Sequence, residues 1–447
     1  MRNRPSTRRS AGPAPRITLP RGRVMVLAAA GAAVVTLAAG CGSSGSSGGS
    51  QVAASAKQTI IFATQGLGSE GTATTKAVAA FEKLHPNIKV NILNLSPTSD
   101  VAFEQLTQRF TSGSSTPDVI TSDVIWPAQF AQSGWLANLS QFKPATGSYF
   151  PAQMATGEYK GGVYAMPWFI NAEGLYYRTD LIKTPPTTWA ELISDAQAAM
   201  KSDPSLKEGL AFEGDKYEGA VTAFQSMGGQ LSTGDLSNID TATNKAVLTN
   251  MYDAVNVNHI APSAVSTWEE SQVQDAWLSG QTPFALNWPY IFALSDGKGC
   301  QPGCSPVFGK TGWVPFPSTS GSPQASLGGD DLAINAKSTH QAAAWELIQY
   351  LSSDSAQDAR AISAGDPPSV KSAYNAQLYA AAPYFKQEQG VYAAATPRPV
   401  TPVYTQISSQ LQTMISSVLT GESTPAAALS STAPTIKQLL QTVNSGG

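Results

Sequence analysis

Gln58-Thr-Ile-Ile-Phe-Ala-Thr64 begins the stretch that decides the fold, because this short run is rich in residues that favour a β-strand. Residues 73–84 follow with apolar side chains at helical spacing, and residues 88–93 alternate like a second strand. A second helix is expected at 101–110 and a third strand at 118–121. Strands and helices that alternate in this order predict an α/β fold with a mostly parallel sheet and helices on both of its faces.

Helical patterns dominate the rest of the chain. Short extended runs at 282–287 and 331–335 lie between the helices. The stretch after the N-terminal region, about 390 residues, is too long for one ordinary hydrophobic core and suggests two lobes. The later helices are expected at residues 189–200, 244–257, 271–278, 339–351 and 405–420.

Residues 1–41 have the pattern of a secretory signal peptide. Seven arginines and no acidic residue precede an uncharged, Ala/Val/Leu-rich stretch at 24–40. Leu37-Ala-Ala-Gly-Cys41 resembles a bacterial lipobox, in which the cysteine becomes lipidated, although the leucine stands four residues before Cys41 rather than three. An uncleaved membrane anchor is the alternative, but the apolar run is slightly short of a full span. Both interpretations place the rest of the chain outside the cytoplasm, and lipidation of Cys41 would anchor it to the cell membrane.

A Gly/Ser-rich segment at 42–57 follows this leader and is expected to act as a flexible linker. The whole chain has 28 basic and 31 acidic residues; without the seven arginines of the leader, 21 basic residues remain, which gives a net charge of −10. A protein with this charge and no basic stripe is not expected to bind nucleic acid. We also expect a monomer that contacts the membrane only through its N-terminus.

Cys300 and Cys304 lie in a Gly/Pro-rich loop. Outside the cytoplasm, two cysteines at this spacing favour a local disulfide. A zinc site is the alternative, but it would need further Cys or His ligands nearby, and His85, His259 and His340 are far away in the sequence. The pattern therefore predicts a Cys300–Cys304 disulfide and no metal site.

The stretch Gly66-Leu-Gly-Ser-Glu-Gly71 matches the glycine pattern of a dinucleotide site between a strand and a helix. The second strand, however, ends in Asn91 and Asn94, so no acidic residue is placed to bind a ribose. Nicotinamide cofactors are also not expected outside the membrane. We therefore expect no cofactor.

Several motifs along the chain resemble those of one known family. Phe81-Glu-Lys-Leu-His-Pro-Asn-Ile-Lys-Val90 is similar to the opening of the bacterial extracellular solute-binding proteins that serve sugar ABC transporters. The likeness continues in the same order over residues 58–440. Asn287-Trp-Pro-Tyr290, Leu327-Gly-Gly329 and Arg398-Pro-Val-Thr-Pro-Val-Tyr404 are most similar to the trehalose/maltose-binding branch. The other matching segments are 117–136, 159–168, 174–181 and 185–192.

The resemblance implies a two-lobed fold like that of the type II periplasmic binding proteins. Each lobe would hold a mixed sheet flanked by helices, with the ligand in a cleft between the lobes. We expect the first lobe at 58–166 plus 292–346 and the second at 167–291 plus 347–440. The function implied is that of a lipid-anchored, non-enzymatic binding protein, which captures a di- or oligosaccharide and delivers it to the permease of an ABC importer.

A sugar site needs aromatic rings for the C–H faces of the sugar and polar groups for its hydroxyls. In the resemblance, Trp288 and Tyr290 are the stacking candidates, Arg398 is a cationic donor, and Asn171 stands where relatives often have an acidic residue. The full set of ligand-binding residues implied is Glu70, Asp123, Phe169, Asn171, Glu270, Trp288, Tyr290, Gly329, Asp330 and Arg398. We expect the neighbouring Glu269 to be solvated.

One departure from the branch leaves alternatives open. Asp330-Asp331 stands where the branch has an aromatic residue, which allows an amino sugar or another cationic ligand such as a polyamine. A rival class is a lipid-anchored glycoside hydrolase, which would use two carboxylates of the cleft, drawn from Glu70, Asp123, Glu270 and Asp330. The family resemblance argues against the hydrolase, because members of the family bind without reacting.

Overall fold

Five strands form the first sheet, in the order β2-β1-β3-β10-β6. β1 (Gln58–Thr64) lies parallel to β2 (Ile88–Asn94) and to β3 (Val119–Asp123). β10 (Leu327–Ile334) runs antiparallel to both β3 and β6 (Ala165–Ala172). The mostly parallel sheet predicted from the N-terminal βαβαβ pattern is therefore present, with one reversed strand that arrives from much later in the chain.

This computed structural model describes residues 50–66, 68–231, 238–295, 304–317 and 325–445. The described residues all belong to one compact unit. The predicted leader, Cys41 and most of the linker lie outside the described residues, as does Cys300. Cys304 is disulfide-bonded. In the part of the chain that the structure describes, no helix has both the length and the apolar character needed to cross a membrane.

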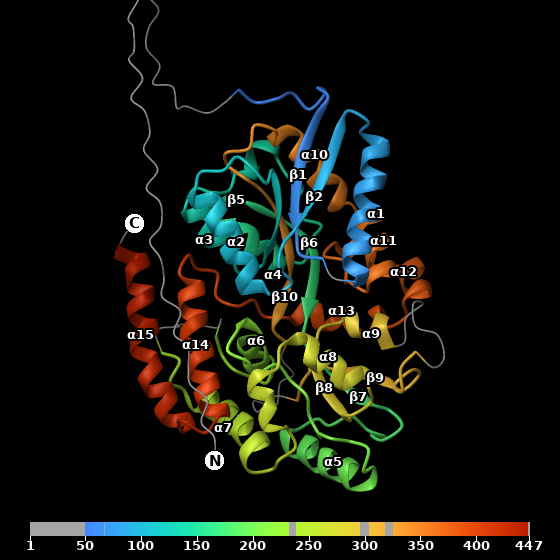
Figure 1. Cartoon of the computed structure of the whole chain (residues 1–447), viewed down its shortest axis with the longest axis vertical. Coiled ribbons are helices and arrows are strands. Elements are labelled where there is room, and N and C mark those ends of the chain that lie inside the picture. The colour runs from blue at the N-terminus through green and yellow to red at the C-terminus, as the bar shows by residue number, and fades with distance from the viewer. Residues whose placement is uncertain (1–49, 67, 232–237, 296–303, 318–324, 446–447) are drawn as a thin grey trace, which may run out of the picture. The chain divides into compact units, whose positions relative to one another are not determined.

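Helices cover the first sheet as the sequence pattern predicted. α1 (Gly68–Leu84) and α2 (Ser99–Thr111) connect its first three strands. α10 (Gln341–Leu351) follows β10, and α11 (Asp354–Ala364) packs beside α1 (Figure 1). α1 begins five residues before the expected start at Ala73, because the Gly-Ser-rich turn that opens the helix carries no apolar periodicity.

The second sheet is antiparallel and has the order β8-β7-β9. Its strands are β7 (Gly174–Arg178), β8 (Phe284–Asn287) and β9 (Thr311–Val314), and a parallel bridge joins Ala211 to Ala285. Two sheets with flanking helices make the two-lobed α/β fold expected from the sequence.

Strand pairing departs from the predicted lobe ranges in two places. β6 stays in the first sheet as far as Ala172, although 167 was the predicted start of the second lobe. β9 pairs with β7 in the second sheet, although it falls in a range assigned to the first lobe. Pairing between strands more than a hundred residues apart cannot be read from local periodicity. α11 also falls in a range assigned to the second lobe, although it packs beside α1 on the first sheet.

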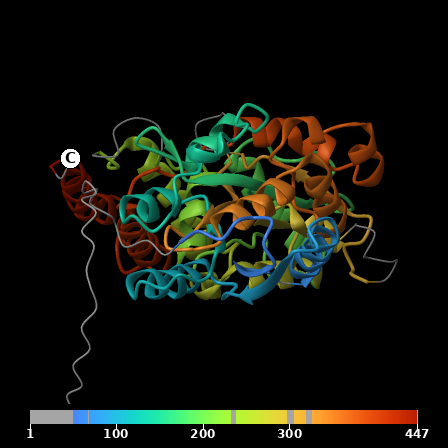
Figure 2. The same cartoon turned by 90° about the horizontal axis from the view of Figure 1, so that it is seen from above.

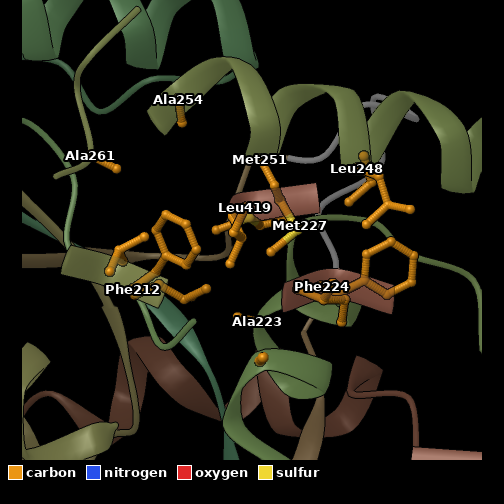
Figure 3. Close-up of a cluster of buried hydrophobic side chains, with 14 of the residues drawn as sticks. Phe212, Ala223, Phe224, Met227, Leu248, Met251, Ala254, Ala261 and Leu419 are labelled. Atoms are coloured by element: carbon orange, nitrogen blue, oxygen red, sulfur yellow. The ribbon is translucent and has the colours of Figure 1, made fainter. Parts of the chain in front are cut away.

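The core of the second lobe is built by helices from distant parts of the chain. Figure 3 shows Phe212, Phe224, Met227, Met251 and Leu419 among the side chains that gather there. They come from α6 (Glu218–Ser226), α7 (Ala242–Asn256), α14 (Tyr404–Leu419) and the segments beside these helices. α15 (Pro425–Ser445) packs along α14, and the two helices lie side by side in both views (Figures 1 and 2). The burial of these apolar side chains is the main force that holds the C-terminal helices on this lobe.

The shorter elements connect the two sheets and cover their edges. α5 shows how local sequence sets a boundary, because the Thr188 side chain accepts a hydrogen bond from the backbone N–H of Glu191 in a capping box. The remaining elements are α3 (Pro127–Gln132), α4 (Pro151–Met154), β4 (Glu158–Tyr159), β5 (Gly162–Val163), α5 (Trp189–Ser202), α8 (Glu270–Leu278), α9 (Tyr290–Ser295), α12 (Ala376–Ala381) and α13 (Phe385–Ala394), with single 3-10 turns at Leu139–Phe142, Ala155–Gly157, Ser263–Thr267 and Lys371–Ala373.

Candidate functional site

The first wall of the site lies at the edge of the first sheet where β3 and β6 end and β10 begins. Strand register brings the predicted residues together there, since Asp330 pairs with both Asp123 and Phe169, and Gly328 pairs with Asn171. Because β10 is antiparallel to its two neighbours, its first residues meet the last residues of β3 and β6. With Gly329 of β10, five predicted site residues thus lie at one edge of one sheet.

The second wall comes from the other lobe. Glu270 is the first residue of α8, and its backbone N–H donates to the Tyr217 hydroxyl at 3.0 Å. Trp288 follows β8, and Tyr290 begins α9. The Tyr290 hydroxyl donates to the Glu270 carboxylate, which moderates the rise that burial causes in the pKa of Glu270. Tyr290, Trp288 and the Glu270 carboxylate thus belong to the same wall.

A cavity of about 280 Å³ lies between the two walls, and its lining includes all ten of the predicted ligand-binding residues. A single cavity lined by residues of both lobes is the arrangement expected of a ligand site in a two-lobed binding protein. The ten residues are Glu70, Asp123, Phe169, Asn171, Glu270, Trp288, Tyr290, Gly329, Asp330 and Arg398.

The glycine pair of β10 is required by close packing inside this site. A Cβ atom at Gly328 would lie 2.7 Å from a ring carbon of Trp288, so the indole rests directly against the strand backbone. Gly329 has φ +101°, and a Cβ there would lie 2.2 Å from the carbonyl oxygen of Phe169. The Leu-Gly-Gly motif therefore positions the Trp288 ring and permits the tight contact between β10 and β6.

Arg398 is held by two carboxylates from different lobes. Its Nη1 donates to Glu218 Oε1 at 2.7 Å, and its Nη2 lies 3.4 Å from Asp123 Oδ1. Glu218 also accepts hydrogen bonds from the hydroxyls of Tyr404, at 2.6 Å, and Ser408. Of the guanidinium nitrogens, Nε has no hydrogen-bond partner among the described residues. The cationic donor expected from the sequence is thus occupied mainly by protein carboxylates.

A second buried arginine supports Phe169 from behind. The Arg360 guanidinium lies 4.1 Å from the ring centroid of Trp168 and 4.7 Å from that of Phe169. It also forms an ion pair with Asp366 at 2.7 Å. Burial raises the pKa of the nearby Glu70 carboxyl, and the negative charge of Asp366 raises it further. Phe169 is therefore a fixed aromatic wall of the cavity.

The two consecutive aspartates of β10 have different surroundings. Asp330 lines the cavity, and burial together with the charge of Asp123 raises its pKa. Asp331 is fully buried away from the cavity, where its Oδ2 accepts a hydrogen bond from the Thr156 hydroxyl at 2.9 Å. Burial raises the pKa of Asp331 to about 8. Successive residues of a strand face opposite sides, so only Asp330 of this pair can contact a ligand in the cavity.

Sequence reasoning missed the acidic wall that precedes and begins α6. Glu213, Tyr217 and Glu218 line the cavity, and so does Glu269, which we expected to be solvated. The stretch Glu213-Gly-Asp-Lys-Tyr-Glu218 directly follows an apolar run, and this position at the end of an extended segment is the signal that could have identified it. The other lining residues that were not predicted are Gln65, Gly66, Pro97, Thr98, Ser99, Gly219, Thr222, Ser271, Gln274 and Gly328.

The chemistry of this lining suits a polyhydroxylated ligand. Aromatic rings from Phe169, Trp288 and Tyr290 can pack on apolar C–H faces, while the carboxylates accept hydrogen bonds from hydroxyls. Within the described residues, no group of three or more His, Cys, Asp or Glu side chains is arranged to hold a metal ion.

Comparison with known proteins agrees with this architecture. Residues 65–358 match the family described as bacterial extracellular solute-binding protein. The chain belongs to this family. A "Probable ABC transporter-binding protein" of Deinococcus radiodurans is 33% identical over 391 residues, which cover 83% of this chain and 91% of that relative. Membership of this solute-binding family places the protein outside the cytoplasm, as the leader suggested.

Solved structures of solute-binding proteins have the same two-lobed fold. The maltose-bound MalE3 of T. maritima is 31% identical, with a TM-score of 0.79, and the match covers 85% of this chain and 99% of that one. A solute-binding protein of Thermotoga lettingae with bound α-D-tagatose is 24% identical, with a TM-score of 0.77, over 86% of this chain and 100% of that one. This solute-binding protein therefore has the type II periplasmic-binding-protein fold, as predicted.

Proposed function

We propose that this solute-binding protein captures a di- or oligosaccharide in the cavity between its lobes and delivers it to the permease of an ABC importer. The observation that carries the proposal is the cavity lining, which combines the aromatic side chains of Trp288, Tyr290 and Phe169 with carboxylates from both lobes. The maltose-bound relative with 31% identity and the relative named as ABC transporter-binding support the ligand class and the transport role.

A thermal-shift screen over neutral and amino-substituted mono-, di- and oligosaccharides tests the ligand class, because a ligand that binds only the folded protein raises its melting temperature. We expect at least one saccharide to raise it and to bind in calorimetric titration. If no saccharide raises the melting temperature of protein with a normal unfolding transition, the proposed ligand class is wrong. Release of monosaccharide during long incubation with a bound disaccharide would favour the glycoside hydrolase instead.

Delivery to a permease requires that the loaded and empty forms differ in shape. A ligand favours the closed form only through its higher affinity for that form, so it must contact both lobes. Asp123 on the first lobe and Glu270 on the second offer such contacts across the cavity. Small-angle scattering should give a smaller radius of gyration with saturating sugar than without it. An unchanged radius despite tight binding would leave a rigid sugar-binding module.

We further propose that the leader is removed and that Cys41 is lipidated, in line with the lipobox-like sequence before it. Stable anchoring needs more than one acyl chain, so we expect multiple acylation of this cysteine. Cys41→Ser should release the protein from membranes or retain an uncleaved leader, both visible by mass spectrometry of fractionated cells. A Cys41→Ser protein with unchanged mass and membrane association would contradict the proposal.

A further inference from the structure

The cavity is lined by far more carboxyl groups than cationic groups. Seven carboxyl-bearing side chains line it, together with one arginine, and that arginine is already paired with Glu218 and Asp123. The other five form no ion pair with any described residue of the protein. These five are Glu70, Glu213, Glu269, Glu270 and Asp330.

Glu213 is the most deeply buried of these five residues. It is 1% exposed, and its Oε1 has no hydrogen-bond partner within the part of the chain that the structure describes. A Cβ at Gly219 would lie 1.9 Å from Glu213 Oε2, so the carboxyl group is confined against the first turn of α6. A buried carboxyl oxygen without a partner is costly, and the residue that carries it lines a cavity that a ligand can fill.

The residues around Glu213 make the ionised form of its carboxyl group less favourable still. Burial raises the pKa of Glu213, and the negative charges of Glu270, Glu173 and Glu269 raise it further. Hydroxyls of a neutral sugar can donate hydrogen bonds to these carboxyls, but they supply no positive charge that would favour the ionised carboxylates. A ligand ammonium group supplies both a donor and the missing positive charge, and charge-assisted hydrogen bonds are roughly twice as strong as neutral ones.

We infer that the natural ligand is a saccharide that carries a protonated amine, and that the amine lies against the wall formed by Glu213, Glu269 and Glu270. This inference rests on the proposed function, because the aromatic side chains Trp288 and Tyr290 still require sugar ring faces. It deepens that function by assigning the acidic wall of the second lobe to ligand recognition. Asp331 takes no part, since it is buried behind the strand.

The test compares sugars that differ only in amines that replace hydroxyls, one in each monosaccharide pair and two in the disaccharide pair. The probes are glucosamine with glucose, galactosamine with galactose, mannosamine with mannose, and the glucosamine disaccharide with cellobiose, and each is titrated calorimetrically at neutral pH. We expect at least one amino sugar to bind tenfold or more tightly than its hydroxyl counterpart. Glu213→Gln keeps the shape of the side chain and should bring that preference close to parity, while the affinity for the neutral sugar changes less than threefold.

Two further variants separate the acidic wall from a general effect of charge. Glu270→Gln should also reduce the preference for the amine. Glu422→Gln changes an exposed carboxylate between α14 and α15, outside the cavity, and should leave the preference intact. If Glu213→Gln does not fold, Glu270→Gln alone tests the inference, because Glu270 belongs to the same acidic wall and its loss should also reduce the preference for the amino sugar.

The outcomes distinguish the two proposals. Equal or tighter binding of the hydroxyl sugar in every pair overturns the amine inference and leaves the proposed sugar-binding function standing. An amine preference that survives in both Glu213→Gln and Glu270→Gln also overturns it, since the amine would then lie elsewhere. Tighter binding of spermidine than of any amino sugar contradicts the sugar requirement and, with it, the proposed function. No binding of any saccharide overturns both.

Discussion

Replacement of Arg398 by methionine should destabilise the protein strongly, because it leaves Glu218 charged, buried and without its cation. The Glu218 and Arg398 side chains are 5% and 2% exposed. Removal of one partner from a buried ion pair costs about 3–5 kcal/mol. Glu218 keeps its hydrogen bonds from Tyr404 and Ser408, and Asp123 keeps one from Ser99 at 2.9 Å, which reduces the cost. The loss of the Arg398 contact with the Leu327 carbonyl adds about 1 kcal/mol. We expect a total loss of about 3–4 kcal/mol in the free energy of unfolding.

Urea unfolding at neutral pH, followed by tryptophan fluorescence, measures this loss. The double variant Arg398→Met with Glu218→Gln should recover a large part of it, because the uncompensated charge is gone. Lys89→Met is the matched surface control, since Lys89 pairs with Glu82 at 2.6 Å but is 65% exposed. Exposed pairs contribute about 0–1 kcal/mol, so this variant should change stability little. A loss below about 1 kcal/mol in Arg398→Met, or no recovery in the double variant, would refute the reasoning.

Three further predictions follow from the site and its support. Trp288→Ala should weaken the best saccharide about tenfold to a hundredfold by removing a stacked ring, whereas Trp135→Ala, which lies outside the cavity, should leave the affinity measured by titration unchanged. Gly329→Ala should lower the free energy of unfolding by more than about 2 kcal/mol, because its Cβ would meet a β6 carbonyl at 2.2 Å. Gly134 has φ +70° and nothing within 4 Å of a Cβ, so Gly134→Ala should lower the free energy of unfolding by only about 1 kcal/mol. If the two alanine variants lose the same stability, the clash of the residue 329 Cβ with the β6 carbonyl is not the cause. The pKa of Asp331 is raised from 3.8 to about 8, so its contribution to stability is complete below pH 4 and is lost as the pH rises through about 8. Asp331→Asn should therefore gain stability relative to the natural protein between pH 4 and pH 8, and parallel pH profiles would show that Asp331 titrates normally.

Much of this architecture was accessible from the sequence because the signals are local. Alternating and helical spacing identified β1, α1, β2, α2 and β3 to within a few residues, since side-chain periodicity depends only on neighbours along the chain. The ten residues that the family resemblance singled out all line one cavity, and Asp123, Phe169, Asn171 and Asp330 among them lie near strand ends.

The partners of those residues were decided by tertiary structure alone. Arg398 meets Glu218 and Asp123 across 180 and 275 residues of sequence, and no periodicity reports a contact at that distance. Alternation along β10 puts Asp330 and Asp331 on opposite faces, and the pairing of β10 with β3 and β6 decides that Asp330 is the one at the cavity. Glu213 became part of the site only when α6 was packed beside the first sheet's edge, because burial and electrostatic repulsion depend on the three-dimensional surroundings of a carboxyl group rather than on its neighbours in the chain.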